Sequence, residues 1–169
     1  KIEEVVSLGY PSYWLSLDTN AHRRNADLIL GAQKGDEPIK ISVSAGEINS
    51  VTEMTIYTPD HPGLFSTIAG AIAIFGRNIV GAKIFTMANG MALDIFTIQD
   101  VGSGGLSGDG DLERLIDKIK SALRGDWSPS ANLKDKSNLG GRENIFTVPP
   151  RVLVNNSASR DRKSTRLNS

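Results

Sequence analysis

The residues most able to bind a small molecule lie in the short stretch Asp-His-Pro-Gly at positions 60–63. This stretch separates a run of strand-forming residues from an apolar segment with helical spacing. Pro62 suits the first position of a helix, because its missing N–H would be unpaired there in any case. Gly63 has no side chain, so a ligand can approach the first backbone N–H groups of the helix closely. The pattern predicts a small anion-binding site at the start of this helix.

The predicted site places an acidic side chain beside a positive helix start. The N–H groups of Gly63, Leu64 and Phe65 would bind a carboxylate, and the helix dipole would add to the attraction. Asp60 directly precedes them and could either cap the helix or face an ammonium group. One charge of each sign is what the two ends of an α-amino acid require. Acid–base chemistry by Asp60 and His61 is the alternative, but without a nucleophile or a third partner a ligand contact or a loop histidine is favoured.

A strand and a helix must position this stretch. Residues 51–58 alternate with a period of two, and one face is more apolar than the other, which predicts a strand. Apolar side chains then recur at spacings of three and four from about Pro62 to Phe75, which predicts a helix. Gly76 follows at the place where a left-handed residue ends many helices.

A hairpin is predicted next. Residues 78–87 and 91–100 are rich in strand formers, and Ala88-Asn89-Gly90 between them contains the Asn-Gly pair that tight turns favour. A loop of two residues and a loop of three residues would put opposite sets of side chains toward the core. The sequence alone therefore does not decide which residues of the two strands face inward. Asp94 is expected to pair across the sheet with Lys83. Apolar side chains on both faces predict a partner sheet or domain over the face that the helices leave free.

The remaining elements complete a fold class. Residues 112–123 have the spacing of an amphipathic helix. An extended segment follows at 144–155, where Pro149-Pro150 confines a strand to a sheet edge or a bend. The order strand, helix, strand, strand, helix, strand predicts an α+β fold, a ferredoxin-like βαββαβ sandwich with two helices on one face of the sheet.

The segment before these elements, residues 1–46, is predicted to be a partly helical connector with too few apolar side chains for a core of its own. Asp18 or Thr19 is expected to cap a helix in it. The alternation in residues 39–43 indicates a short strand. Asp18 and His22 are four residues apart and could share a helix face as metal ligands, but no third ligand is suitably spaced, so a solvated connector is favoured.

Composition narrows the classes of partner. Lysine plus arginine and aspartate plus glutamate both count 19, so no net field attracts nucleic acid or an anionic membrane. The absence of cysteine excludes disulfides and thiolate chemistry and fits a reducing compartment. The longest apolar run, AGAIAIF, is too short to span a membrane, and the start KIEEVV is acidic where a signal peptide is basic. A soluble, cytoplasmic protein is expected.

The segment DHPGLFSTIAGAIAIFGRNIVGAKIFT, residues 60–86, resembles the strand-loop-helix-strand core of ACT domains. These modules typically bind amino acids at interfaces between paired copies. The resemblance adds Asn78, with Ile79 beside it, to the ligand-binding positions Asp60, His61, Pro62, Gly63, Leu64 and Phe65. Asn78 is expected near the start of the helix that begins at Pro62. The alternative for Asn78 is an ordinary polar residue after the helix stop at Gly76.

Four segments in matching order resemble the family of bifunctional uridylyltransferase/uridylyl-removing enzymes, which modify the PII nitrogen-signalling protein. They are YPSYWLSLDT, TEMTIYTPDHPGLFSTIAGA, GMALDIFTIQD and FTVPPRVLVNNSAS. The resemblance implies that residues 1–46 connect to an HD hydrolase domain. It also implies that residues 47–158 form an ACT domain, with a core at 50–125 and a final strand at 144–155.

The same resemblance implies a nucleotidyltransferase domain and an HD domain, with Mg²⁺, before Lys1, and a second ACT domain after Ser159. The chain is then a regulatory fragment without catalytic residues or a cofactor of its own. Glutamine is the implied ligand, a second ACT domain or another copy is the implied neighbour, and PII is the target of the parent enzyme. A ligand-free interaction module and a small free-standing enzyme are the alternatives.

The end of the chain departs from this pattern. DRKSTRLNS, residues 161–169, resembles a translated sequencing adaptor. Residues 159–169 are therefore expected to be a non-native or disordered tail, and their basic side chains carry no functional weight.

Overall fold

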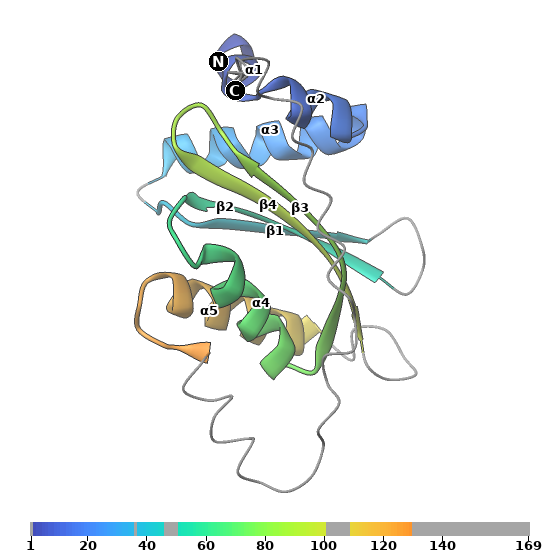
Figure 1. Ribbon diagram of the computed structural model, residues 1–169, viewed down its shortest axis with the longest axis vertical. Helices are drawn as coiled ribbons and strands as arrows, with labels where there is room; N and C mark the ends of the chain where they lie inside the picture. The colour runs from blue at the N-terminus through green and yellow to red at the C-terminus, as the bar shows by residue number, and fades with distance from the viewer. Residues whose placement is uncertain (1, 36, 46–50, 101–108, 130–169) are drawn as a thin grey trace, which may run out of the picture. The chain divides into compact units, whose positions relative to one another are not determined.

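The computed structural model describes residues 2–35, 37–45, 51–100 and 109–129. All of these lie in the first of two compact units, residues 1–139 and 140–169. The elements in chain order are α1 (Ile2–Leu8), α2 (Pro11–Ser16), α3 (Thr19–Lys34), β1 (Lys40–Ala45), β2 (Val51–Pro59), α4 (Leu64–Ile74), β3 (Arg77–Thr86), β4 (Met91–Asp100) and α5 (Asp109–Leu123) (Figure 1).

The four strands form one sheet in the order β1-β2-β4-β3, with every neighbouring pair antiparallel. The chain is therefore α+β, and the order β2-α4-β3-β4-α5 confirms the ferredoxin-like arrangement predicted from the sequence. The strand predicted at residues 144–155 lies outside the described residues. The edge of β2 that a final ferredoxin-like strand would occupy is paired with β1, whose residues were assigned to the connector.

The hairpin between β3 and β4 has a loop of three residues. The Met87 N–H donates to the Met91 carbonyl at 2.7 Å, and the Gly90 N–H donates back to the Met87 carbonyl at 3.0 Å. Gly90 has a φ of 76°, a left-handed conformation that glycine adopts without steric cost. The three-residue loop fixes which side chains share a face of the sheet, a question that the sequence left open. Phe85 lies level with Leu93, and Ile84 lies level with Asp94.

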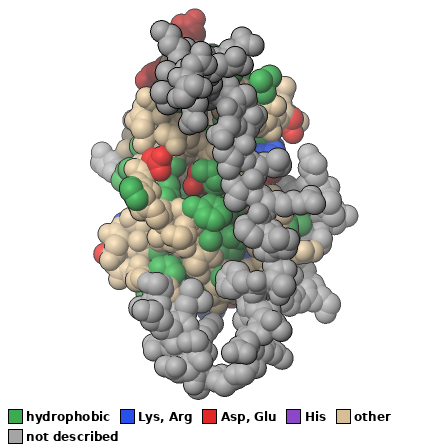
Figure 2. All heavy atoms as spheres, in the orientation of Figure 1, with side chains coloured by type: hydrophobic (Ala, Val, Ile, Leu, Met, Phe, Trp, Pro, Cys, Tyr) green, Lys and Arg blue, Asp and Glu red, His purple; other side chains and the backbone are tan. Residues whose placement is uncertain are grey.

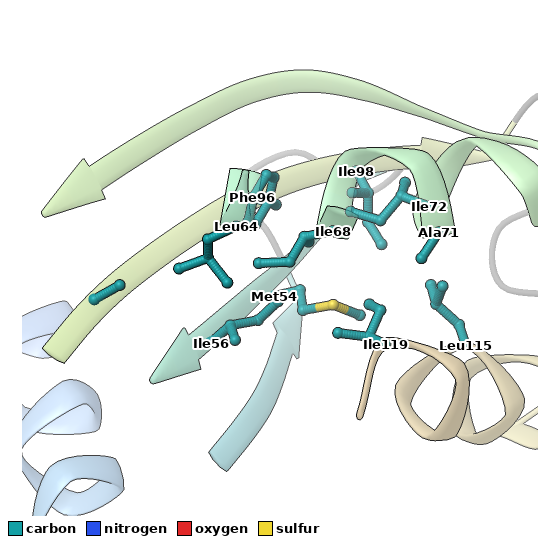
Figure 3. Close-up of a cluster of buried hydrophobic side chains, with 11 residues drawn as sticks. Met54, Ile56, Leu64, Ile68, Ala71, Ile72, Phe96, Ile98, Leu115 and Ile119 are labelled. Carbon is teal, nitrogen blue, oxygen red and sulfur yellow. The ribbon is translucent and has the colours of Figure 1, made fainter. Parts of the chain in front are cut away.

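One face of the sheet packs against α4 and α5 (Figure 1). Alternate side chains of β2 and β4 meet the apolar stripes of both helices, as strand and helix periodicities require (Figure 3). Burying each large side chain of this kind contributes about 1.5–3 kcal/mol. The buried residues labelled there are Met54, Ile56, Leu64, Ile68, Ala71, Ile72, Phe96, Ile98, Leu115 and Ile119.

The other face of the sheet packs against α1, α2 and α3 (Figure 1). The Tyr13 and Phe85 rings meet edge to face with centroids 5.2 Å apart, and the Ala88 N–H donates to the Leu8 carbonyl at 2.9 Å. The prediction that a partner sheet or domain covers this face is therefore wrong. The chain's own first helices cover this face. Their few apolar side chains are enough, because the strands of the sheet contribute the other side chains of the same core.

The polar residues singled out in the first helices have structural roles. Asp18 caps α3 by accepting the Ala21 N–H at 2.7 Å, and this bond holds the pKa of its carboxyl below the usual value. The His22 ring lies 4.8 Å from that of Trp14 and 5.1 Å from that of Tyr13, so His22 is packed rather than solvated. Within the described ranges no group of three or more histidine or acidic side chains could hold a metal ion.

The described part of the chain contains no helix that is long and apolar enough to span a membrane.

Candidate functional site

The predicted ligand stretch forms the turn before α4, and Gly63 sets where that helix begins. Gly63 is the N-cap residue with a φ of 84°, a left-handed conformation that cannot continue into a right-handed helix. The helix therefore starts at Leu64, and the prediction that Pro62 occupies its first position is wrong. The Leu64 N–H donates to the His61 carbonyl at 3.2 Å, so it is not free for a ligand as predicted.

The remaining donors at this helix start are those of Gly63 and Phe65. Within the described part of the chain neither backbone N–H has a hydrogen-bond acceptor, as is usual for the first turn of a helix. The Ser66 hydroxyl donates to the Gly63 carbonyl at 2.8 Å. His61 is exposed, and its Nδ1 lies 3.0 Å from the Pro62 carbonyl oxygen. Two of the three donors predicted for an anion therefore have no acceptor within the described part of the chain.

Asp60 is held beside this helix start by the sheet. Its N–H donates to the Gly90 carbonyl at 3.2 Å, and its Oδ2 accepts the Thr86 hydroxyl at 2.9 Å. The carboxylate does not cap α4. Of the two roles predicted for Asp60, the cap is not realised, and the geometry leaves the carboxylate exposed at the junction of β3 and the α4 turn.

Asp94 is a buried acid that the sequence analysis did not assign to the site. Asp94 is 1% exposed, and its Oδ1 has no hydrogen-bond partner among the described residues. Burial raises the pKa of its carboxyl to about 7, and the negative charge of Asp60 adds to the rise, while the Phe85 backbone opposes it. Acids with raised pKa values are typical of functional sites, and Asp94 lies close to the exposed Asp60.

The predicted pair between Asp94 and Lys83 does not form. Asp94 lies level with Ile84 on β3, whereas Lys83 lies level with Ile95. Since successive side chains of a strand point to opposite faces, the two charges are on opposite sides of the sheet. The Lys83 ammonium instead donates to the Ser16 carbonyl at 3.1 Å.

Asn78 and Ile79 lie at the opposite end of the sheet from Asp60. Asn78 is level with Gln99, which is level with Val51 at the start of β2, whereas Asp60 follows the end of that strand. The nine residues of β2 separate these ends by roughly 26 Å. The expectation that Asn78 lies near the start of α4 is wrong, because α4 carries the chain back along the sheet before β3 begins.

Apolar side chains surround the Asp60 and Asp94 region. Phe65 is 46% exposed and stacks on Phe96 with ring centroids 5.6 Å apart, and Ile84 is 49% exposed on the edge strand β3. Figure 2 shows hydrophobic side chains gathered in the middle of one face, with acidic side chains beside them. The site thus combines a helix start, two acids and an apolar margin.

Comparison with curated proteins gives matches along nearly the whole chain. A protein of Azospirillum brasilense is 44% identical over 159 residues, which cover 93% of this chain, and it is a bifunctional uridylyltransferase/uridylyl-removing enzyme. The chain is homologous to a segment of these enzymes. The same enzyme of Rhodospirillum rubrum is 38% identical over 167 residues, and that of Gluconobacter oxydans is 38% identical over 160 residues. They cover 98% and 94% of this chain.

The matches confirm the resemblance to uridylyltransferase/uridylyl-removing enzymes. They also show that the resemblance concerns only a part of those enzymes. The chain spans 17% or 18% of the length of these three relatives, so it corresponds to a fragment of such a protein. No family model matches the chain. The activity in the name of these enzymes belongs to the whole relatives.

Proposed function

We propose that the chain is a glutamine-sensing ACT module of a uridylyltransferase/uridylyl-removing enzyme and regulates catalysis carried out elsewhere in that protein. The observation that carries the proposal is the helix start at Gly63 with the Asp60 carboxylate beside it. An α-amino acid has a carboxylate that can bind at the helix start and an ammonium group that can bind to Asp60. The homology to the enzymes supports a regulatory context rather than an isolated binding protein.

The ligand carboxylate is assigned to the start of α4. The N–H groups of Gly63 and Phe65 belong to residues at the positive end of the helix dipole, and an anion placed there would give these donors an acceptor. A Cβ added at Gly63 would meet only the Ser66 hydroxyl, at 3.7 Å, so the space beside this residue is open to a ligand. The ammonium group is assigned to Asp60, whose orientation is set by Thr86.

Asn78 is assigned to the same ligand, but from a second ACT domain or another copy. In the described sheet β3 is an edge strand, with β4 as its neighbour. If the β3 edges of two copies pair antiparallel about a two-fold axis, the start of one β3 lies beside the end of the other. Asn78 of one copy then approaches Thr86 and Asp60 of the other, although the two positions are far apart within one chain.

In the parent enzyme, glutamine would shift the balance between uridylylating PII and removing the uridylyl group. This requires glutamine to bind one arrangement of the ACT and catalytic domains more tightly than another. A coupling of about 1–3 kcal/mol is typical for allosteric proteins. The contact of α1, α2 and α3 with the sheet offers a physical route, since the connector packs on the strands that carry Phe85, Asp94 and Thr86.

Among the described strands β3 lies at the sheet edge, which also favours a second candidate, an interaction module that binds no ligand. Val80 is 53% exposed on this edge and would be covered by a paired strand. This candidate predicts self-association that glutamine does not change.

An NMR titration of the 169-residue chain with L-glutamine tests the proposal. Chemical-shift changes are expected at residues 60–65 and 78–79, with an affinity of roughly millimolar that tightens as the protein concentration rises. D-glutamine serves as a control with the same charges and the wrong arrangement. No response to L-glutamine, or a response confined to other residues, would show that the module is not a sensor of this kind.

A further inference from the structure

The burial of Asp94 is unfavourable for the stability of this fold. A buried carboxylate costs free energy when its hydrogen bonds are incomplete, and a second negative charge nearby increases that cost. Asp94 has a hydrogen bond with the Phe85 backbone. Its Oδ1 is unpaired within the described residues, and the neighbouring charge is Asp60. Asparagine would fill the same space without the charge. The structure therefore holds an acid where folding alone favours a neutral side chain.

The position of Asp94 relates it to the start of α4. Asp94 projects from the face of β4 that also carries Ala92 and Phe96, and these two belong to the core that includes Leu64 of α4. Thr86 lies level with Ala92, so it is a diagonal neighbour of Asp94 on the same face. The Thr86 hydroxyl in turn holds the Asp60 carboxylate. Asp94 and Asp60 thus lie on the same side of the β3-β4 pair.

We propose that Asp94 is a ligand-binding residue, and that its buried carboxylate and the exposed carboxylate of Asp60 together bind the α-ammonium group of an amino acid. The inference rests on the proposed function, because the ligand carboxylate is assigned to the start of α4. It adds a residue that neither the motif nor the homology assigns, and it names the ligand group that the residue recognises.

An ammonium group fits the two acids chemically. It has three N–H donors in a tetrahedral arrangement, so it can donate to Asp60 and to the unpaired Oδ1 of Asp94 at once. Its positive charge removes the repulsion between the two carboxylates, and charge-assisted hydrogen bonds are about twice as strong as neutral ones. A ligand without the ammonium group would bring a third negative charge toward two acids.

The pair of acids therefore supplies selectivity for amino acids over otherwise similar carboxylic acids. Repulsion by Asp60 and Asp94 acts against any ligand that has the carboxylate alone. Because burial and Asp60 hold the pKa of Asp94 near 7, part of the Asp94 population is protonated at neutral pH. Binding of the ammonium group favours the ionised form, so binding should release protons.

The decisive experiment compares two ligands on two proteins. The 169-residue chain and its Asp94→Asn variant are titrated by NMR with L-glutamine and with 4-carbamoylbutanoate, which is glutamine without its α-amino group. We expect Asp94→Asn to weaken glutamine binding by about 10- to 100-fold, as for the loss of one hydrogen bond between charged groups. The same variant should bind 4-carbamoylbutanoate as well as or better than the unmodified chain. Asp117→Asn, an exposed acid on α5, is the control for net charge and should change neither affinity.

A second variant and a second readout protect the test from a folding defect. Asp60→Asn changes an exposed side chain and should reproduce the ligand-dependent pattern of Asp94→Asn. Calorimetry of glutamine binding in buffers with different ionisation enthalpies should show proton release that Asp94→Asn abolishes. Equal glutamine affinity in the unmodified chain and Asp94→Asn would overturn the inference and leave the proposed function standing. Failure of the unmodified chain to bind glutamine would overturn both.

Discussion

The Thr86 hydroxyl donates to the Asp60 carboxylate at 2.9 Å, and this bond ties the turn before α4 to the end of the edge strand β3. A strand end and a helix start that are distant in sequence thereby position one acid. The bond is exposed, so its contribution lies in orientation rather than in folding free energy.

Thr86→Val tests that orientation. Valine keeps the branched shape that suits a strand but cannot donate to Asp60, so glutamine affinity should fall by roughly 3- to 10-fold while stability changes by less than about 1 kcal/mol. Thr97→Val on β4 is the matched control, because its side chain projects from the opposite face of the sheet. Calorimetric titrations of the two variants check the prediction, and equal affinities for both would mean that Thr86 does not orient Asp60.

The pH dependence of stability tests the burial of Asp94. Its carboxyl has a pKa of about 7 in the folded chain against 3.8 for the ordinary side chain. A raised folded-state pKa means that the folded chain binds the proton more tightly than the unfolded chain. The resulting stability is fully present below pH 3.8 and is lost as the pH rises through about 7.

Asp94→Asn should therefore be more stable than the unmodified chain at pH 8, by up to about 4 kcal/mol. The difference between the two free energies of unfolding should shrink as the pH falls toward 4. Urea denaturation at several pH values measures it, and taking the difference cancels carboxyls such as Glu37, whose pKa is lowered in the fold by Lys120 and Arg124 despite partial desolvation. A difference that does not vary with pH would show that Asp94 is not a buried acid.

Two glycine substitutions should change stability in opposite directions. Gly63→Ala places a Cβ on a residue with a φ of 84°, so it should destabilise the fold by about 1–2 kcal/mol. Gly31→Ala lies inside α3 with no atom within 4 Å of the added Cβ, so it should stabilise the fold by about 1 kcal/mol. Thermal unfolding of both variants measures the two changes. A neutral Gly63→Ala would mean that the turn before α4 relaxes to another conformation.

The regular elements of the α4 and α5 half were predictable because their periodicities are local. Alternation in β2 and the spacing of three and four in α4 follow from which side chains are buried on one face. The helix stop at Gly76 and the cap at Asp18 were also found, because each depends on a residue type with a specific backbone role. The start of helix α4 lies two residues later than predicted, since the left-handed conformation of Gly63 cannot be told from its residue type alone.

The site was predicted less completely, because its missing parts depend on register and on the order of strands. The burial of Asp94 and its separation from Lys83 follow from the parity of β4, which the hairpin loop decides. The distance between Asp60 and Asn78 follows from the parallel course of β2 and β3 on either side of β4. The cover that α1, α2 and α3 provide was missed because an apolar helix face does not show what it packs on. The predicted domain boundaries remain predictions.

The proposed amino-acid site uses Asp60 of one copy and Asn78 of another, and mixing two variants distinguishes this shared site from a site within one copy. Asp60→Ala and Asn78→Ala should each bind L-glutamine more weakly than the unmodified chain, because each removes one side of every site. In a mixed pair of copies one site regains both side chains, so an equal mixture should recover roughly a quarter of the wild-type sites by random pairing about a two-fold axis. Calorimetry of the two variants, alone and mixed, gives the number of sites. A shared site predicts recovery on mixing. Wild-type binding by Asn78→Ala alone, or no recovery in the mixture, would show that Asp60 and Asn78 of different copies do not form one site.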